Sequence, residues 1–406
     1  MRTYRELFSV GEFRVLFGTQ CLVMASVSIG SLALGTITYS ATASPVLTAL
    51  AMFGGPLVQL VGSQFLLSLS DLLRPRSALL LVGCTMMVCE ALQALPGLAW
   101  PSRFLLMAVP WLVMSATSGT RVALMSEILP PQAFVLGRST MNIAVGVMQV
   151  AGYSTGGVLL LALSTTDLFL VSAGFLLLAV VWLRFGLADR PARASDAKVV
   201  RRTRQVNRHL LSSPVLRPLY LYLWVPNGLV VGCEALFVPF AGHHAGYLFA
   251  VTAGGMLLGD VVVGRFVPER VRDRLIGPLR LLLAVPYLAC FFGPSVAVVA
   301  VLGMVASFGY SASLPLQERL LAHTHASHRG QVLGLASVGL MVLQASGALL
   351  GGAVGQLLTH VVATPSAAAA KAMSVMAATS VLVTLGLSRG LARSALPDVA
   401  TRPPSV

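Results

Sequence analysis

Two acidic residues lie inside long apolar stretches of the sequence, Glu90 within 77–96 and Glu234 within 218–240. If these stretches cross a membrane, a charge at the centre costs at least about 2.5 kcal/mol, so each acid marks a candidate functional site. We expect Glu234 to bind a coupling proton or a cationic substrate, and Glu90 is a second candidate for this role. Alternatively, Glu234 lies in water at the outer mouth of the protein.

Polar and aromatic residues near Glu234 extend this candidate site. Asn227 precedes Glu234 by seven positions, so the two side chains share one face of a helix. Trp224 lies one turn before Asn227, and Gln20 is a polar residue of the first apolar stretch. We predict that Asn227, Trp224 and Gln20 contribute to substrate or proton binding together with the two acids.

A second group of charged residues lies mostly at the ends of the apolar stretches, where ion pairs can link neighbouring stretches. We interpret the group as a cytoplasmic gate whose ion pairs hold while the outer side is open and break when the inner side opens. The alternative is that these charges only set the topology and solvate the helix ends. The group consists of Asp71, Arg74, Arg76, Arg121, Glu127, Arg138, Asp260, Arg265, Glu318 and Arg329.

Three pairs of matching patterns indicate an internal duplication. Glycines at matched spacing recur 195 positions apart, as Gly152, Gly156 and Gly157, then Gly347, Gly351 and Gly352, each set preceded by a glutamine. An acid eleven positions before an arginine occurs at Glu127 and Arg138 and again, 191 positions later, at Glu318 and Arg329. The pair Asp71 and Arg76 matches Asp260 and Arg265 at 189 positions, although Arg74-Pro-Arg76 also aligns with Arg270-Val-Arg272. Small residues let helices pack closely, so we expect the six glycines to lie at helix interfaces.

The composition shows which elements must position these residues. Hydrophobic residues make up 56% of the 406 positions and charged residues only 10%, with a mean hydropathy of +0.84. A soluble domain is about 25% charged. In hydrocarbon every backbone amide needs an internal partner, and unbroken apolar runs such as 175–183 exclude the alternating pattern of a barrel strand. The sequence therefore predicts an all-α integral membrane protein.

Spans of roughly 20 apolar residues can be placed at twelve positions. They are 14–38, 45–69, 77–96, 104–128, 140–163, 167–186, 218–240, 245–264, 275–293, 296–320, 331–357 and 366–388. The one long connection divides them into two six-helix bundles related by a pseudo-twofold axis. We predict an N-terminal bundle over 1–186, a basic linker over 187–217 with a short amphipathic helix near 197–211, a C-terminal bundle over 218–388 and a tail over 389–406.

The basic residues indicate the orientation. Only Arg103 and Lys371 lie on the outer side and Arg121 within a span if the N-terminus is inside, so both termini are predicted to be cytoplasmic. The net charge of +14 therefore reflects topology, and we expect no nucleic-acid partner. Arginine outnumbers lysine 26 to 2, which is typical of a GC-rich bacterial genome and suggests a bacterial inner membrane.

Several of these features together resemble the major facilitator superfamily (MFS). They are two sets of six spans, a basic central loop and an acid–arginine motif after the second span. The family motif reads roughly G-x-x-x-D-R-x-G-R-R; Asp71 and Arg76 match it, whereas Leu67, Leu72 and Arg74 replace its first Gly, first Arg and second Gly. The segment 152–157 resembles the G-P-x-x-G-G tail of the antiporter motif, with Tyr153 in place of the proline.

The resemblance implies a proton-coupled exporter of small organic molecules, such as drugs or secondary metabolites, that works by alternating access. In this family spans 1, 4, 7 and 10 line the central cavity, which favours Glu234 over Glu90. Some multidrug exporters carry a carboxylate in span one, and this chain has none there.

Alternatives are an uptake permease for a nutrient and a membrane sensor or assembly partner that does not transport. The glycines can also serve tight helix packing alone, with no bearing on the direction of transport.

Neither catalysis nor a cofactor is expected. The sequence has no phosphate-binding loop and no Ser–His–Asp arrangement placed for chemistry. His323, His325 and His328 could form a metal site, but no acid or cysteine lies beside them, so a solvated loop is favoured and no metal is predicted. The five cysteines fall in apolar segments and act as small hydrophobes. The expected partners are a small-molecule substrate, protons and the lipid bilayer, and the chain is expected to be a monomer.

Overall fold

The structure is a computed structural model, and it describes residues 4–66, 74–117, 120–160, 162–191, 208, 210–324 and 329–393. Every regular element within these ranges is helical, and they contain no strand. This confirms the prediction of an all-α chain. The physical reason is that an apolar segment satisfies its own amides only by forming a helix.

Proline and serine mark the starts of many helices in the first half of the chain. Pro45, Pro75 and Pro131 each occupy the first position of a helix. A backbone N–H at this position would have no partner within the helix, so its absence in proline costs no hydrogen bond. Ser164 and Asp167 form a reciprocal capping box at the start of α9. The helices are α1 (Tyr4–Ser9), α2 (Gly11–Thr42), α3 (Pro45–Phe53), α4 (Gly55–Leu66), α5 (Pro75–Gln93), α6 (Trp100–Ala116), α7 (Thr120–Ile128), α8 (Pro131–Leu159) and α9 (Thr165–Gly186).

Short irregular turns interrupt several helices in the second half. The tightly wound pieces η2, η4 and η5 and the wider π-turn η3 extend or connect α-helices. The elements are α11 (Leu216–Glu234), α12 (Phe237–Ala241), η2 (Gly242–His244), α13 (Ala245–Val261), η3 (Val262–Phe266), α14 (Glu269–Ala284), η4 (Val285–Phe292), α15 (Val296–Phe308), η5 (Gly309–Ala312), α16 (Ser313–Ala322), α17 (Arg329–Leu358) and α18 (Pro365–Arg393). The surface helix predicted near 197–211 lies mostly outside the described residues.

Each of the twelve predicted spans coincides with one helix or with consecutive helices. Among the described residues, nine helical stretches are long and apolar enough to cross a membrane. A tenth is obtained if α3 and the first part of α4 form one span, bent by 61° at Gly54. Twelve crossings therefore remain a prediction, whereas a multi-pass helical protein is what the structure supports.

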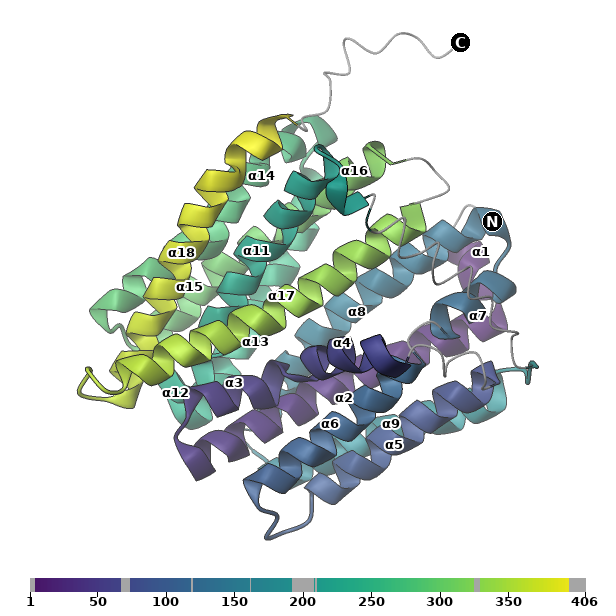
Figure 1. The fold of residues 1–406 in the computed structure, drawn as a ribbon, viewed down its shortest axis with the longest axis horizontal. Coiled ribbons are helices and arrows are strands. Elements are labelled where there is room, and N and C mark those ends of the chain that lie inside the picture. Colours follow the sequence, from purple (N-terminus) through teal and green to yellow (C-terminus); the bar gives the residue numbers. More distant parts are fainter. Residues whose placement is uncertain are drawn as a thin grey trace.

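The helices gather into two groups that follow the order of the chain. Figure 1 shows α2, α5, α6 and α9 packed together in the purple-to-blue part of the chain, and α11, α14, α15 and α18 in the teal-to-yellow part. We call these the N-half and the C-half. They meet where α8 packs on α13, where α17 packs on α3 and where α12 touches α2 and α3. We call the end with α1, α16 and the end of α18 the terminal side, and the end with α3 and α12 the far side (Figure 1).

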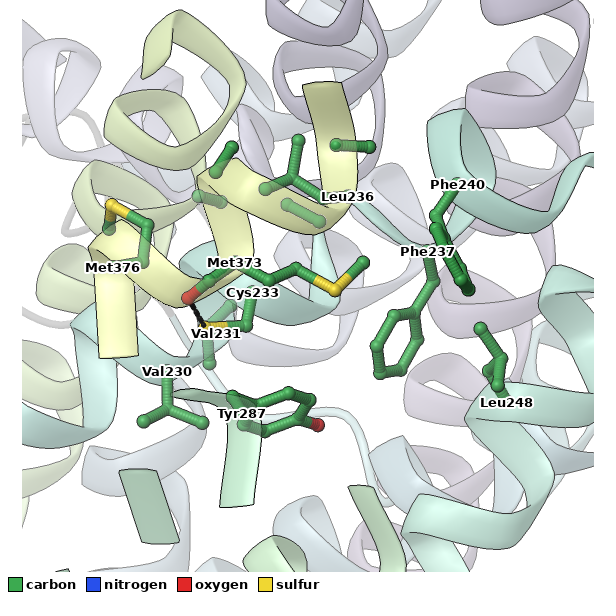
Figure 2. Close-up of a cluster of buried hydrophobic side chains, with 14 of the residues drawn as sticks. Val230, Val231, Cys233, Leu236, Phe237, Phe240, Leu248, Tyr287, Met373 and Met376 are labelled. Carbon is green, nitrogen blue, oxygen red and sulfur yellow. Dashed lines mark hydrogen bonds between the residues drawn. The ribbon is translucent and has the colours of Figure 1, made fainter. Parts of the chain in front are cut away.

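The contacts that join the two halves are concentrated at the far side. Ser44 donates a hydrogen bond of 2.9 Å to Oε1 of Gln356 in α17. Tyr39, near the end of α2, donates to the carbonyl of Pro239 in α12 at 3.4 Å. The largest apolar cluster also spans the two halves, since Leu32, Met52 and Phe53 belong to it together with many C-half residues. Figure 2 shows C-half members of this cluster, including Phe237 and Tyr287.

The terminal side has apolar clusters of a different kind. One cluster gathers Phe13, Leu124 and Leu183 from N-half helices, and another gathers Tyr220, Leu316 and Val332 from C-half helices. Neither contains buried residues from both halves. Apolar burial therefore ties the halves together at the far side, while each half closes on itself at the terminal side.

Glycines allow the closest helix contacts within each half. A Cβ on Gly152 would lie 2.6 Å from the Cβ of Ser28 in α2, so α8 rests on the backbone of α2 there. In the C-half, a Cβ on Gly347 would overlap the carbonyl of Gly228, and one on Gly351 would overlap that of Gly232, so α17 rests in the same way on α11. A Cβ on Gly156 would also lie close to α2, 3.3 Å from Leu32.

The third glycine of each set lies between the halves. A Cβ on Gly157 would overlap the backbone of Gly246 at the start of α13. A Cβ on Gly352 would lie 2.8 Å from the carbonyl oxygen of Pro45 at the start of α3. Equivalent glycines of the two motifs thus make equivalent contacts, as a duplicated unit related by a pseudo-twofold axis would.

The far-side contacts predict the outcome of a cross-linking experiment. With Ser44→Cys and Gln356→Cys in a chain without its native cysteines, a short bifunctional thiol reagent should join the two halves efficiently. After cleavage at a protease site inserted within 192–207, the halves should migrate together on a denaturing gel. The pair Glu127→Cys and Glu318→Cys at the terminal side serves as control, and equal cross-linking of both pairs would contradict the arrangement.

The glycine contacts predict a difference between two alanine substitutions. Gly347→Ala should destabilise the protein by about 1 to 3 kcal/mol, because α17 and α11 must separate to admit the methyl group. Gly254→Ala is the control, since a Cβ there has no neighbour within 4 Å and alanine favours the helix. The measurement is the apparent unfolding midpoint of the purified protein in detergent. A similar midpoint for both variants would argue against the close contact.

Candidate functional site

Two adjacent cavities lie within the helices. The first, which we call the N-half cavity, is enclosed by α2, α3, α4, α5 and α6 and contains about 530 Å³ of space free of protein atoms, part of it open to solvent. The second, the interface cavity, contains about 450 Å³ measured in the same way and is lined by N-half helices and by α17 of the C-half. Val27, Met52 and Trp111 line both cavities, so the two are neighbours.

Tyr153 connects the two halves at the interface cavity. Its ring stacks on Phe249 of α13 with centroids 5.4 Å apart, and its hydroxyl accepts a hydrogen bond of 3.3 Å from Ser31 in α2. Tyr153 occupies the position of the proline in the antiporter motif. Tyr153, which departs from the motif, thus forms an aromatic contact between α8 and α13 beside the interface cavity.

A hydrogen bond links Asn227 of α11 to Gln344, a residue that lines the interface cavity. Gln344 of α17 lines this cavity and donates a hydrogen bond of 2.9 Å from Nε2 to Oδ1 of Asn227. Asn227 is fully buried, and its Nδ2 has no hydrogen-bond partner among the described residues. A buried amide with an unused donor is expensive, which marks this pair as a polar site able to receive an acceptor.

Trp224 and Gln20 lie away from both cavities. Trp224 is buried, donates from Nε1 to the carbonyl of Ala336 at 2.9 Å and stacks on Tyr220 with centroids 4.8 Å apart. It therefore packs α11 against α17. Gln20 is half-buried on α2, and it is not among the residues that line either cavity.

Glu234 lies in a buried polar network of the C-half. It is the last residue of α11, directly before the break that precedes α12. Its carboxylate accepts a hydrogen bond from Tyr310 of η5. Tyr310 in turn interacts electrostatically with Arg280, a fully buried arginine of α14 that donates to the carbonyl of Leu223 at 3.3 Å. Glu234 is thus half-buried, with Tyr310 as its hydrogen-bond partner and Arg280 one step further along the network.

Glu90 lines the N-half cavity. Its carboxylate lies against Gly30 of α2, where an added Cβ would be 2.6 and 2.7 Å from the two oxygens. Ser172 of α9 is a hydrogen-bond partner of the carboxylate, and Oε2 is buried without a partner among the described residues. Helix α5 therefore contributes this acid to the wall of a cavity within the N-half.

The terminal-side acids of the N-half form ion pairs within that half. Arg190, just after α9, donates to both oxygens of Glu12 in α2 at 2.8 and 2.7 Å and lies 3.7 Å from Glu127 of α7. The hydrogen bonds that Arg190 donates to Glu12 raise the pKa of Arg190 above its ordinary value. Arg74 pairs with Asp189 at 2.8 Å.

The C-half has its own terminal-side pairs, between α14 and α16. Arg272 donates to Glu318 at 2.7 Å, and Arg319 donates to both carboxylate oxygens of Asp273, one of them at 2.7 Å. The two pairs are formed by adjacent residues, since Arg272 precedes Asp273 and Glu318 precedes Arg319. The basic–acidic dipeptide at 272–273 and the acidic–basic dipeptide at 318–319 are 46 positions apart, and this is the signal that could have revealed both pairs in the sequence.

The ion pairs described above each stay within one half, and those that involve residues of the expected gate join them to residues that were not part of it. Sequence spacing missed Glu12, Arg190 and Asp273 because their partners lie on helices far away in the chain. Arg138 does reach the other half, where its guanidinium lies against Gly334 of α17.

The remaining residues of the expected gate are placed as follows. Arg76 donates to the carbonyl of Arg184, and Arg121 donates to the carbonyl of Leu16 at 3.2 Å. Asp260 is half-buried and Arg265 exposed, with no ion pair between described residues for either. Asp71 lies outside the described residues, as does the side chain of Arg329.

Comparison of the whole chain with solved structures found transporters of similar shape. A POT family transporter in complex with a thioalcohol-conjugated peptide matches with a TM-score of 0.67 at 13% identity, over 95% of this chain and 96% of that one. Peptide transporter POT in complex with sulfate matches with a TM-score of 0.65 at 12% identity, over 97% and 99%. A bacterial homologue of the human lysosomal transporter Spinster, inward-facing and occupied, matches with a TM-score of 0.57 at 12% identity, over 100% of both chains.

The chain has the MFS fold. No protein-family profile matches the sequence, and no curated protein matches it.

The terminal-side ion pairs of this MFS fold predict a contrast in stability. Asp273→Asn should destabilise the protein by about 3 to 5 kcal/mol, because it leaves the buried charge of Arg319 unpaired. Asp189→Asn should change stability by less than about 1 kcal/mol, since its pair with Arg74 is exposed. Apparent unfolding midpoints in detergent measure both. A loss for Asp189→Asn as large as that for Asp273→Asn would contradict this assignment.

Proposed function

We propose that this chain is a secondary transporter that exports small organic molecules in exchange for protons. The observation that carries the proposal is the interface cavity, which is lined by residues of both halves and lies next to far-side contacts that join them. Alternating access requires a site of this kind, where one bundle can rock against the other around a bound molecule.

The arrangement of contacts supports a state that opens toward the terminal side. Hydrogen bonds and apolar packing join the halves at the far side, and the terminal-side clusters belong to single halves. Close glycine contacts at Gly157 and Gly352 would let α8 move on α13 and α17 on α3 with little obstruction from side chains. In the opposite state these far-side contacts break and the terminal side closes.

The glycine contacts and the buried acid together suggest how a proton drives this motion. When Glu234 is ionised, its carboxylate accepts the hydrogen bond from Tyr310, which also interacts with the buried Arg280. Binding of a proton removes the negative charge and weakens this hydrogen bond, so the contact between α11 and η5 becomes weaker. The break between α11 and α12 lies directly at Glu234, where a change of this kind can alter the helix direction.

The lining of the interface cavity bears on the substrate. Its lining residues are Met24, Val27, Ser28, Met52, Phe53, Pro56, Trp111, Tyr153, Met341, Gln344 and Ala345, which include no charged side chain. Such a surface suits an amphipathic molecule more than a highly charged nutrient. The distribution of basic residues favours cytoplasmic termini, and we place the chain as a monomer in the cytoplasmic membrane of a bacterium.

Glu234→Gln is the variant that tests the coupling. In proteoliposomes it should abolish substrate-linked proton flux, because glutamine keeps the shape of the side chain but carries no exchangeable charge. Asp167→Asn is the matched control: this acid lies at an exposed helix start on the far side, and its substitution should leave proton flux intact. Flux is read from a pH-sensitive dye inside the vesicles while substrates from a broad panel are added.

The same assay tests the proposal as a whole. Expression in an efflux-deficient host should raise tolerance to at least one compound of the panel, and everted vesicles should accumulate that compound when acidified inside. Accumulation in whole cells would instead indicate uptake. If neither tolerance nor flux changes for any compound, the transport proposal fails, and normal proton-driven transport by the Glu234 variant removes its assigned role.

A further inference from the structure

The N-half cavity is lined by one acid, Glu90, and by no basic side chain of the described residues that could balance its charge. Among its polar lining residues, Gln93 is engaged with Arg103, since its Nε2 donates to the Arg103 carbonyl at 3.1 Å. Ser31 donates to Tyr153. Glu90 is left as the polar group with unused capacity, because its Oε2 is buried and has no partner among the described residues.

The chain is shaped to bring this carboxylate into the cavity wall. Gly30 faces Glu90 from α2, and any side chain there would overlap the carboxylate oxygens. Ser172 of α9 is a hydrogen-bond partner of the carboxylate and also pairs with Ser26 of α2 at 2.6 Å. Contacts with α2 and α9 therefore position the Glu90 carboxylate, and its Oε2 remains without a hydrogen-bond partner among the described residues.

No lysine or arginine lines the N-half cavity in the described part of the chain. A buried carboxylate without a counter-ion is costly, so the site favours an occupant that brings positive charge. Trp111 and the methionines Met52, Met86 and Met107 form much of the rest of the wall. An indole face attracts organic cations, and thioether sulfur is polarisable, so the wall suits a poorly hydrated cation.

We infer that the N-half cavity binds the ammonium group of an amphipathic organic cation, with Glu90 as its counter-ion and Trp111 as its aromatic wall. The two cavities share Val27, Met52 and Trp111, so the apolar body of such a molecule extends into the interface cavity toward Phe53 and Tyr153. The inference names a substrate class for the transporter and rests on the proposed function for its biological use. It places the charge-recognition site inside the N-half, apart from the proton site at Glu234.

A matched pair of probes tests the inference by binding alone. One probe is a phenylbutyl-trimethylammonium ion, and the other is its neutral analogue with a tert-butyl group, which has the same shape and no charge. Equilibrium dialysis against the purified full chain measures both affinities. The wild type should bind the cation at least about tenfold more tightly than the neutral analogue, and Glu90→Gln should lose about tenfold in affinity for the cation only.

Two further variants keep the test decisive. Gly30→Ala should weaken cation binding by displacing the carboxylate, whereas Gly254→Ala, with open space around its Cβ, should not. Asp167→Asn, which changes an exposed acid that lines neither cavity, should bind the cation as the wild type does. A wild type that binds both probes alike, as it would if Glu90 stayed protonated, overturns the inference, and so does unchanged cation binding by Glu90→Gln in a folded protein.

Transport is measured separately, so that the two proposals can fail independently. Cation binding that depends on Glu90, in a protein that moves no probe and no protons in proteoliposomes, supports the site and overturns the transport function. Proton-linked flux of neutral compounds with no preference for the cation supports transport and overturns the cation site.

Discussion

The close approach of helix backbones at glycines is the contact on which the rest of this structure depends. Lipid supplies no hydrophobic drive between helices, so their association rests on packing and on buried polar bonds. At Gly347 and Gly351 the α17 backbone lies directly on α11, and α8 lies on α2 in the same manner at Gly152. These contacts bring Gln344 within reach of Asn227, and Ser31 within reach of Tyr153. The polar groups beside the cavities thus meet because the helices carrying them have no side chains at the crossing points.

The charged residues fall into two groups, those that form ion pairs at the terminal side and those within the helices that are incompletely paired. At the terminal side, acids and arginines pair within each half, as Glu12 does with Arg190 and Asp273 with Arg319, and these pairs make each bundle a stable unit. Within the helices the charged groups are few and incompletely paired. Arg280 and Glu90 both keep buried polar atoms without partners among the described residues. A group of this kind is expensive in an apolar surrounding, so its presence is better explained by a ligand or a proton than by stability.

Sequence reasoning identified the two acids, the amide and the glycines, but it did not identify most of the side chains that contact them. Trp224 shares a helix with Glu234, yet it packs on Tyr220 and bonds to α17 instead of lining a cavity. Glu127 and Glu318 were expected to form ion pairs that link spans, and their ion pairs with Arg190 and Arg272 involve arginines outside the expected gate. Residue spacing gives the face of a helix, whereas the neighbour on that face depends on how distant helices cross.

The sequence by itself determined the class of fold, because the run lengths and the scarcity of charge leave a membrane-spanning helix as the state that satisfies every backbone amide. It also determined the equivalence of the two halves, since duplicated glycines keep their spacing wherever the helices lie. Only the tertiary structure decided that Glu234 bonds to Tyr310, that Glu90 turns into a cavity against Gly30, and that far-side contacts join the halves. These outcomes depend on the rotation and crossing of helices separated by a hundred residues or more, and on apolar helices the hydrophobic pattern is too uniform to specify that rotation.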